Sequence, residues 1–496
     1  MLKKIIYFHI ILFLSFSFVN AEIKADYKIV RLYNINHQDI LKLTKEGIDI
    51  DNVWDKNAII YIQYDKLHIL EDMNLSYTVL KRPDLRSKAG YHTYEQIGET
   101  LNAIAIAHPN ICKLYNIGKS YEGRDLWFIK ISDNVDIEED EPEVKYISTM
   151  HGDEPVGTEL CLNFIKYLTD NYGTDQRVTG LVDEMEIWVM PLMNPDGYVH
   201  ERRYNMEGID LNRGFPDRVV DNVNTTEGRA VEIQHIMNWA FAHSSVLSAN
   251  FHTGATVVNY PYDSDFDYTK NYSATPDEDL MVTIALSYAS LNKSMRESYY
   301  FPSGITNGVE WYTAYGGMQD WNYVWLGCNE MTIELHDIKT PSFSKIPELW
   351  DENREAMLTY ISWALRGIRG LVTDAETGNP VKAVVRLSGI DHDMYTDPDV
   401  GDYHRITLPG IYSLSISADG YINKVVNNIS VGENNATRID VKLTPQYLVN
   451  IRTAIVILKI MSNMQINEST KGLDITNDGK LGISDFLYFM NFISLK

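Results

Sequence analysis

The sequence has few cysteines, and few basic residues relative to acidic ones. Its three cysteines, Cys112, Cys161 and Cys328, lie too far apart for a disulfide framework or a thiolate metal site. The sequence leaves open a single disulfide bond between two of them. Lysine and arginine number 44 against 68 aspartate and glutamate residues, so the formal net charge is −24. Nucleic acid is therefore not an expected partner, because a nucleic-acid binder needs a basic surface.

Only one long apolar run is present, and it lies at the N-terminus. Lys3 and Lys4 precede the apolar stretch Ile5–Val19, and Val19-Asn20-Ala21 has the small residues of a cleavage site. Residues 1–21 are therefore predicted to be a signal peptide. The run is shorter than the roughly 20 residues that span a bilayer, which argues against an uncleaved anchor. We expect a secreted protein, extracellular or periplasmic, with no membrane span after cleavage.

Residues 22–88 predict a small α+β unit and a linker. Strand-like and helix-like stretches alternate there, and the unit ends in the basic stretch Lys81–Lys88, which a protease could cut. The predicted strands are Tyr27–Tyr33, Ala58–Ile62 and Ser76–Leu80, and the predicted helices are Gln38–Lys45 and Lys66–Met73.

Residues 89–367 predict a larger α/β domain. Apolar strands alternate with amphipathic helices, which favours a mixed sheet with helices on both faces. The predicted strands include Val144–Thr149, Glu186–Val189 and Val246–Phe251, and the predicted helices include Glu154–Leu168, Val231–Phe241 and Glu352–Leu365.

The pattern changes after Gly367. Short β-prone runs such as Val381–Leu387 and Ile411–Ile416 are separated by turn residues, so residues 368–445 predict a small β-sandwich. Residues 446–496 predict a helix, a polar loop and a second helix.

Possible metal ligands follow two of the predicted strands. His151 and Glu154 stand directly after the strand that ends near Met150, and His252 ends another strand. Strand ends can meet at one edge of a parallel sheet, and zinc accepts nitrogen and oxygen donors while leaving a position for water. Taken alone the motif is weak, and His252 fits a buried, hydrogen-bonded histidine as well.

Further motifs change that balance. With His151-Gly152-Asp153-Glu154 and His252, they occur in order over Tyr91–Gly367, and the chain resembles the zinc metallocarboxypeptidases, most closely their regulatory, carboxypeptidase N/E-like branch. That family implies a mixed eight-stranded-type sheet flanked by helices. The further motifs are Asn194-Pro195-Asp196-Gly197-Tyr198, Arg203, Asp210-Leu211-Asn212-Arg213, Tyr312–Trp321 and Met331–Leu335.

The resemblance implies a role for each matching residue. His151, Glu154 and His252 align with the zinc ligands, and Glu334 aligns with the general base and acid. The remaining implied contacts are Arg203 on the scissile carbonyl, Asn212 and Arg213 on the terminal carboxylate of the substrate, and Tyr312 closing over the substrate.

Asp263 and Gln319 resemble the positions that select lysine or arginine in the regulatory branch. A buried carboxylate would pair with a basic side chain and would leave an apolar one facing an unsatisfied charge. The alternative is that Asp263 starts a solvated acidic loop.

The expected function is that of a secreted zinc carboxypeptidase acting on peptide or protein C-termini, with Lys or Arg preferred. A zinc deacylase on the same scaffold and a non-catalytic peptide-binding relative are the alternatives.

The flanking segments resemble accessory modules. Residues 22–88 loosely resemble a carboxypeptidase pro-segment, which either blocks the site until cleavage or stays as an accessory domain. The β-sandwich resembles a transthyretin-like domain. The C-terminal loop resembles the calcium repeat of dockerin modules, with a solvated turn as the alternative, and docking to a scaffold or cell surface stays open. The predicted calcium (Ca2+) ligands are Asp474, Thr476, Asp478, Lys480 through its carbonyl, and Asp485.

Overall fold

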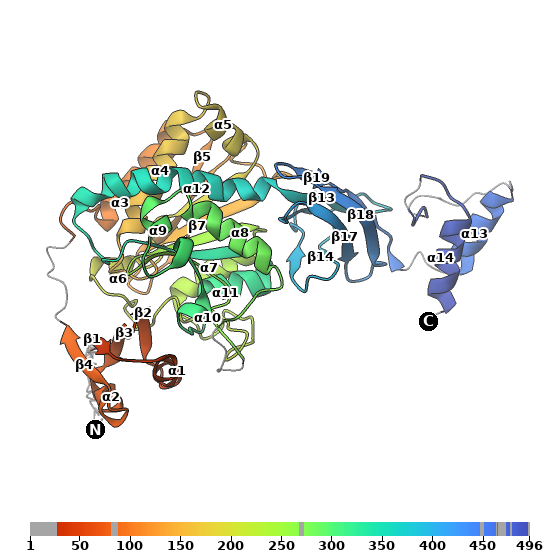
Figure 1. Ribbon diagram of the computed structural model, residues 1–496. Helices are drawn as coiled ribbons and strands as arrows, with labels where there is room; N and C mark the ends of the chain where they lie inside the picture. Colours follow the sequence, from red (N-terminus) through yellow and green to blue (C-terminus); the bar gives the residue numbers. More distant parts are fainter. Residues whose placement is uncertain are drawn as a thin grey trace, which may run out of the picture.

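The chain forms a series of units that follow one another along the sequence in this computed structural model (Figure 1). We call residues 27–80 the N-terminal unit, 88–365 the central unit and 367–443 the sandwich. The predicted signal peptide, residues 81–87 of the basic stretch and Asp478 of the predicted calcium loop lie outside the described residues. The structure describes residues 27–80, 88–266, 272–446, 451–462, 464, 473–476 and 479–494.

The N-terminal unit is a four-stranded antiparallel sheet in the order β2-β3-β1-β4, packed against two helices. Alternate residues of β1, Val30 and Leu32, are fully buried, because successive side chains of a strand point to opposite faces. The predicted strands and helices are confirmed, but the edge strand β2 was not predicted. The elements are β1 Tyr27–Tyr33, α1 His37–Lys45, β2 Asp49–Trp54, β3 Asn57–Gln63, η1 Tyr64–Lys66, α2 Leu67–Asp72 and β4 Ser76–Leu80.

The central unit contains an eight-stranded mixed sheet in the order β11-β10-β12-β9-β7-β8-β6-β5. Strands β8, β7, β9 and β12 run parallel to one another, and antiparallel strands flank them. The predicted mixed sheet is confirmed. The strands are β5 Cys112–Lys119, β6 Asp125–Ile131, β7 Glu143–Ser148, β8 Glu186–Met190, β9 Leu247–His252, β10 Thr256–Tyr260, β11 Ile305–Asn307 and β12 Asn329–Leu335.

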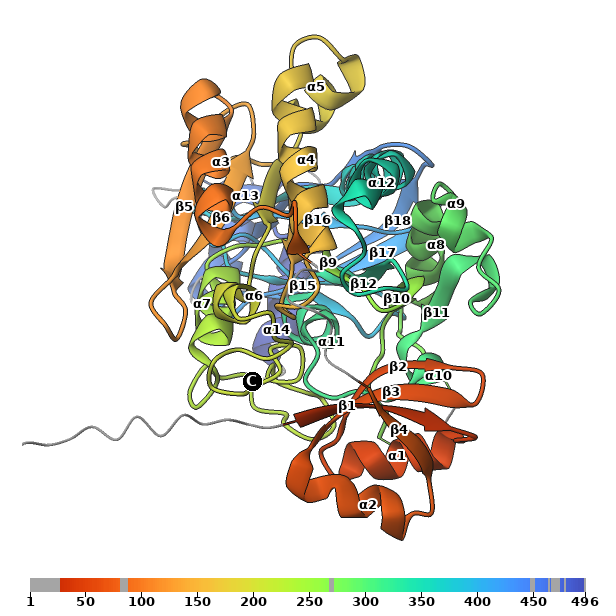
Figure 2. The same cartoon turned by 90° about the vertical axis from the view of Figure 1, so that its left-hand side faces the viewer.

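Helices cover both faces of this sheet, with α3, α4 and α12 on one side and α7 and α11 on the other (Figure 2). Residues of β8 divide between two cores accordingly: Ile187 and Val189 face the first, Trp188 and Met190 the second. The central strands are therefore buried on both faces. The helices are α3 Tyr94–Ala107, α4 Val156–Asn171, α5 Gln176–Asp183, α6 Pro195–Val199, α7 Val231–Phe241, α8 Glu278–Ala289, α9 Lys293–Arg296, η3 Pro302–Gly304, α10 Gly308–Trp311, α11 Met318–Trp321, η4 Asn322–Leu326, η5 Phe343–Lys345, α12 Ile346–Ile361 and η6 Ser362–Leu365.

The last helix of the central unit begins earlier than the sequence predicted. The prediction was Glu352–Leu365, whereas α12 starts at Ile346 and its final turn is the 3₁₀ segment η6. Pro347 lies in the first turn of α12, where a missing backbone N–H is tolerated.

The sandwich consists of two four-stranded sheets and confirms the predicted β-sandwich. One has the order β16-β13-β19 with β20 also pairing with β13, and the other has the order β15-β14-β17-β18. The strands are β13 Gly367–Asp374, β14 Val384–Leu387, β15 Asp393–Tyr395, β16 Asp402–Arg405, β17 Gly410–Ser417, β18 Lys424–Val431, β19 Ala436–Arg438 and β20 Val441–Leu443.

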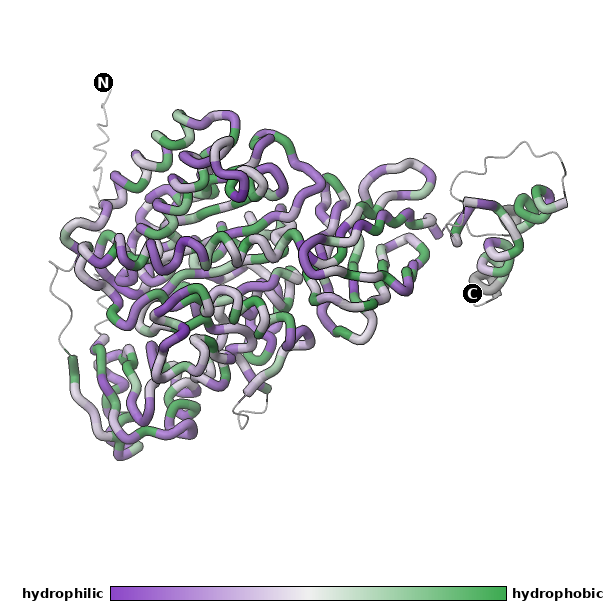
Figure 3. Tube along the Cα trace, turned by 45° about the horizontal axis from the view of Figure 1, so that its top comes forward, coloured by the Kyte–Doolittle hydropathy of each residue, from purple (hydrophilic) through white to green (hydrophobic). Residues whose placement is uncertain are grey.

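Two helices, α13 Ile451–Met461 and α14 Ile483–Ser494, confirm the two helices predicted at the C-terminus. Both are predominantly hydrophobic (Figure 3), and they share a small core. In the loop, Asp485 accepts hydrogen bonds from Thr476 and Gly482, and Asp474 accepts one from Gly479. These bonds shape the loop, and calcium binding stays a prediction.

The three cysteines are buried and unpaired, so no disulfide joins them. Among the described residues, none of the helices has the length and apolar character needed to cross a bilayer.

A buried ion pair joins the sandwich to the central unit. Arg405 is fully buried, and its Nη2 donates to both carboxylate oxygens of Asp277, at 2.9 and 2.8 Å. His392 Nδ1 lies 2.5 Å from Asp277 Oδ2. Burial would raise the pKa of Asp277, but Arg405 and His392 lower it to about 2.

Arg405→Ala should lower the free energy of unfolding by about 3 kcal/mol or more, because it strands a buried carboxylate. Arg386→Ala is the matched control: Arg386 is 46% exposed and pairs with Asp393, so its loss should change stability by about 1 kcal/mol or less. The loss of unfolding free energy caused by Arg405→Ala should reach its full size above about pH 4. It should become smaller as the pH falls toward the depressed pKa of Asp277. Urea unfolding at several pH values measures both, and equal losses in the two variants would contradict this role.

Candidate active site

Two of the predicted metal ligands and the predicted general base lie at the carboxyl ends of neighbouring strands. His151 follows β7, His252 is the last residue of β9, and Glu334 lies on β12. The register of β9 and β12 places Glu334 directly opposite His252, and Ser148 of β7 pairs with Phe251. Strand order therefore brings together residues that are far apart in the sequence.

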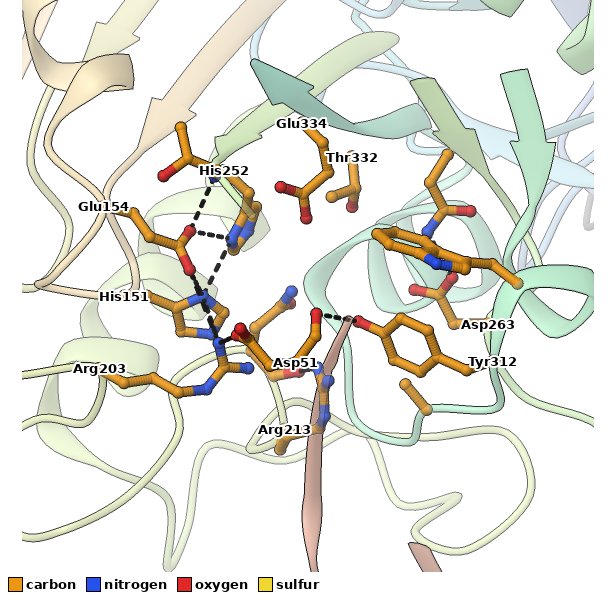
Figure 4. Close-up of a pocket in the computed structure, with 15 residues that line it drawn as sticks. Asp51, His151, Glu154, Arg203, Arg213, His252, Asp263, Tyr312, Thr332 and Glu334 are labelled. Carbon is orange, nitrogen blue, oxygen red and sulfur yellow. Dashed lines mark hydrogen bonds and ion pairs between the residues drawn. The ribbon is translucent and has the colours of Figure 1, made fainter. Parts of the chain in front are cut away.

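His151, Glu154 and His252 point toward one another (Figure 4). Nδ1 of His151 lies 3.0 Å from Glu154 Oε1, and Nδ1 of His252 lies 2.9 Å from Glu154 Oε2. The two Nδ1 atoms are 3.0 Å apart, and each of the three residues is at most 3% exposed. One ligand atom from each residue lies within 4.8 Å of the others.

The donor set fits a zinc ion. Two imidazole nitrogens and one carboxylate are a known ligand set of catalytic zinc, which keeps a further position open. His252 Nε2 is buried and has no hydrogen-bond partner, so the ring is not held through that atom by another side chain. A divalent cation would also relieve the close approach of two imidazole nitrogens.

Asp210 orients the cluster by contacting His151 through the ring nitrogen that does not face Glu154. Its Oδ1 lies 3.0 Å from His151 Nε2, and its Oδ2 accepts a hydrogen bond from Arg203 Nε at 2.9 Å. A carboxylate on the far nitrogen of a ligand histidine fixes the ring and its tautomer. The sequence placed Asp210 in a motif without giving it this role.

Arg203 is buried, and its guanidinium faces the ligand cluster. Nη1 lies 3.1 Å from His151 Nδ1 and 3.7 Å from Glu154 Oε1. A cation fixed beside a metal can stabilise negative charge that develops on a substrate oxygen.

Glu334 is buried beside the ligand cluster, and its Oε2 has no hydrogen-bond partner. Burial, and then the charges of Glu154 and Asp51, raise the pKa of Glu334 well above its usual range. An unpaired carboxyl group here can accept and return a proton, provided that water reaches it.

The predicted carboxylate-binding residues line the same pocket as the metal ligands. Arg213 donates to the Asn212 carbonyl at 2.8 Å and, through Nη2, to the Ile50 carbonyl at 3.1 Å. The Tyr312 hydroxyl lies 3.4 Å from the Asp51 carbonyl. All three predicted residues therefore reach the pocket.

Asp263 also lines the pocket and is buried, unlike a residue of a solvated loop. Its Oδ1 accepts hydrogen bonds from Asn259 at 2.8 Å and from Gln319 at 3.0 Å. Burial raises the pKa of Asp263 to about 6. Gln319 positions this carboxylate.

Sequence reasoning missed two charged residues of the pocket region, Asp51 and Lys339. Asp51 Oδ1 lies 2.8 Å from Arg203 Nη1 and 2.7 Å from Lys339 Nζ. Lys339 Nζ also lies 2.7 Å from Glu154 Oε1. Asp51 belongs to the unpredicted strand β2, and Lys339 follows β12 with no motif around it.

Two family models match the chain. The zinc carboxypeptidase model matches residues 97–356, and the carboxypeptidase regulatory-like domain model matches residues 367–444.

Curated proteins are also similar to this chain. It is 40% identical to carboxypeptidase D of Homo sapiens over 396 residues, which cover 76% of this chain but 28% of that protein. It is 37% identical to carboxypeptidase SOL1 of Arabidopsis thaliana over 366 residues, which cover 73% of this chain and 74% of that protein. Identity to the carboxypeptidase N catalytic chain of Homo sapiens is 36% over 395 residues, covering 71% of this chain and 85% of the relative. The chain thus spans little more than a quarter of carboxypeptidase D.

Solved structures share the fold at low sequence identity. Carboxypeptidase A from Helicoverpa armigera matches with a TM-score of 0.55 and 18% identity, covering 68% of this chain and 97% of that one. Thrombin activatable fibrinolysis inhibitor matches with a TM-score of 0.51 and 18% identity, covering 68% and 98%. These matches establish the fold.

His252→Ala should lower the bound zinc by one equivalent, because it removes one of the three donors of this cluster. Glu334→Gln is the control and should keep the zinc, because Glu334 lies beside the donors without being one. Equilibrium dialysis against buffered zinc, with metal analysis, measures both. Retention of this zinc by His252→Ala, or its loss in Glu334→Gln, would contradict the assignment.

Proposed function

Since this chain belongs to the zinc carboxypeptidase family, we propose that it hydrolyses the last peptide bond of peptides or proteins. The family resemblance expected from the sequence is thereby confirmed, whereas the substrate and the residue roles are our proposal. The observation that carries the proposal is the pocket itself. It contains a three-donor metal cluster, an unpaired glutamate and a buried guanidinium.

Arg213 supports cleavage at the chain end. Its planar guanidinium can donate two parallel hydrogen bonds to a carboxylate. A substrate's free C-terminus offers that carboxylate, whereas an internal peptide bond does not. Asn212 would hold the same carboxylate together with Arg213, and Tyr312 would close over the terminal residue.

Zinc held by His151, Glu154 and His252 would supply Lewis-acid chemistry, polarising the carbonyl and acidifying water. Glu334 would take the proton of the attacking water and deliver it to the departing amine. Arg203 would donate to the carbonyl oxygen as charge develops there, and one such donor is commonly worth roughly 3 kcal/mol of barrier.

Asp263 supports a preference for C-terminal lysine or arginine. Its buried carboxylate faces the pocket and is held by Asn259 and Gln319. A basic side chain would pair with it, while an apolar one would leave it unsatisfied.

The test compares peptides that end in Arg, Phe or Glu, using protein that has been cleaved within Lys81–Lys88 and separated from the N-terminal unit. We expect chelator-sensitive release of Arg, and Asp263→Asn should lower kcat/KM for the Arg peptide by about 100-fold or more with little change for Phe. Asp221→Asn, at a half-exposed aspartate, is the control. Equal rates on all three peptides would refute the preference, and no turnover would favour a peptide-binding role.

We also propose that the N-terminal unit closes the pocket in the intact chain. Each residue of Ile50–Val53 on β2 makes a hydrogen bond to the central unit. Two of these contacts use Arg213 and Arg203, the groups proposed to hold the substrate carboxylate and carbonyl. The C-terminus of a peptide substrate and strand β2 would therefore compete for the same two arginine side chains.

Cleavage within Lys81–Lys88, followed by removal of the N-terminal unit, should raise kcat/KM at least about 100-fold, the effect of freeing a few kcal/mol of competing contacts. Asp51→Asn should raise the activity of the intact chain, because it weakens the contacts with Arg203 and Lys339. Asp55→Asn, at an exposed residue of the same unit, should not. Equal activity before and after removal would instead make the unit a permanent accessory domain.

Export and calcium binding are further proposals that rest on the sequence. Residues 1–21 have the composition of a signal peptide. The C-terminal loop carries donors at calcium-loop spacing. A scaffold or cell-surface partner for this tail is part of the same proposal.

A further inference from the structure

A second group of potential metal ligands lies between the central unit and the sandwich. Asp140 belongs to the loop between β6 and β7, while Asp402 and His404 lie on β16. Residues two apart on a strand share a face, so both β16 side chains project the same way. One ligand atom from each of the three residues lies within 4.8 Å of the others.

The two residues on β16 are almost completely buried. Asp402 is 2% exposed and His404 is 3% exposed, and His404 Nε2 lies 2.8 Å from Asp402 Oδ2. The other oxygen of Asp402, Oδ1, is buried without a hydrogen-bond partner, and so is Oδ1 of Asp140. Buried carboxylate oxygens are normally paired, because leaving one unsatisfied is costly. These two oxygens therefore lack a positive partner.

Carboxylates crowd this junction, because Asp397, Asp140 and Glu143 all lie close enough to Asp402 to act on its charge. Arg438 pairs with Asp140 Oδ2 at 2.6 Å, but it is 39% exposed and leaves Oδ1 free. A divalent cation at this junction would compensate charge that Arg438 does not.

The donor set distinguishes among cations. Calcium and magnesium prefer oxygen ligands alone, whereas zinc and similar first-row ions combine imidazole nitrogen with carboxylate oxygen. Here His404 offers an imidazole nitrogen, and Asp140 and Asp402 offer carboxylate oxygens. The 2.8 Å separation of His404 and Asp402 resembles the 2.9–3.0 Å separations in the pocket cluster.

We propose that Asp140, Asp402 and His404 form a second, structural zinc site that fastens the loop between β6 and β7 to strand β16. The site lies apart from the substrate pocket and shares none of its residues. It would hold the sandwich against the central unit and take no part in peptide hydrolysis.

The test counts zinc ions in the full chain after saturation with zinc chloride and gel filtration. Wild-type protein should bind two equivalents, and His252→Ala and His404→Gln one each, because each variant loses a different site. Asp140→Asn, on the loop, should also lower the count to one without altering β16. A single equivalent in the wild type, or two in both His404→Gln and Asp140→Asn, would overturn the proposal.

Thermal unfolding gives a readout that does not depend on activity. Zinc should raise the melting temperature of His252→Ala, in which the pocket cluster is disabled. The same zinc should leave the melting temperature of the His252→Ala/His404→Gln double variant unchanged, even if that variant starts lower. Equal shifts in the two proteins, or no shift in either, would show that this junction binds no zinc.

Discussion

The register of three neighbouring strands decides where the chemistry of this protein can occur. Parallel pairing of β7, β9 and β12 brings His252 beside Glu334 and places His151 at the adjacent strand end. Glu154 completes the cluster from the turn before α4. A slip of one residue in either pairing would turn a ligand to the opposite face of the sheet. Helices on both faces bury these strands and so oppose such a slip.

Charge complementarity organises the surroundings of that cluster. Glu154 lies between Lys339 and the guanidinium of Arg203, and Asp51 from the N-terminal unit lies against the same two cations. Arg203, which we propose to act on the substrate carbonyl, is therefore engaged by an acidic residue of the chain itself. Because these groups are buried, solvent screens them little. In the function that we propose, occlusion and substrate binding would therefore use one electrostatic arrangement.

Much of this could be predicted from the sequence, because family motifs and hydrophobic periodicity are local signals. The eight-stranded sheet, the sandwich and the motif residues of the pocket follow from them, whereas Asp51 does not. Strand β2 was missed because Asp-Ile-Asp-Asn-Val-Trp lacks an apolar alternation. Its polar residues meet a polar pocket rather than solvent, which only the assembled structure reveals. Lys339 likewise carries no motif, and Asp140 and His404 are separated by most of the central unit.

The central claim is that His151, Glu154 and His252 surround one zinc ion. Anomalous diffraction on both sides of the zinc absorption edge tests it most directly. The account predicts a peak at about 2.0–2.2 Å from both Nδ1 atoms and from the Glu154 carboxylate. Absence of a peak at that position in zinc-saturated crystals, with the three side chains turned apart, would contradict it.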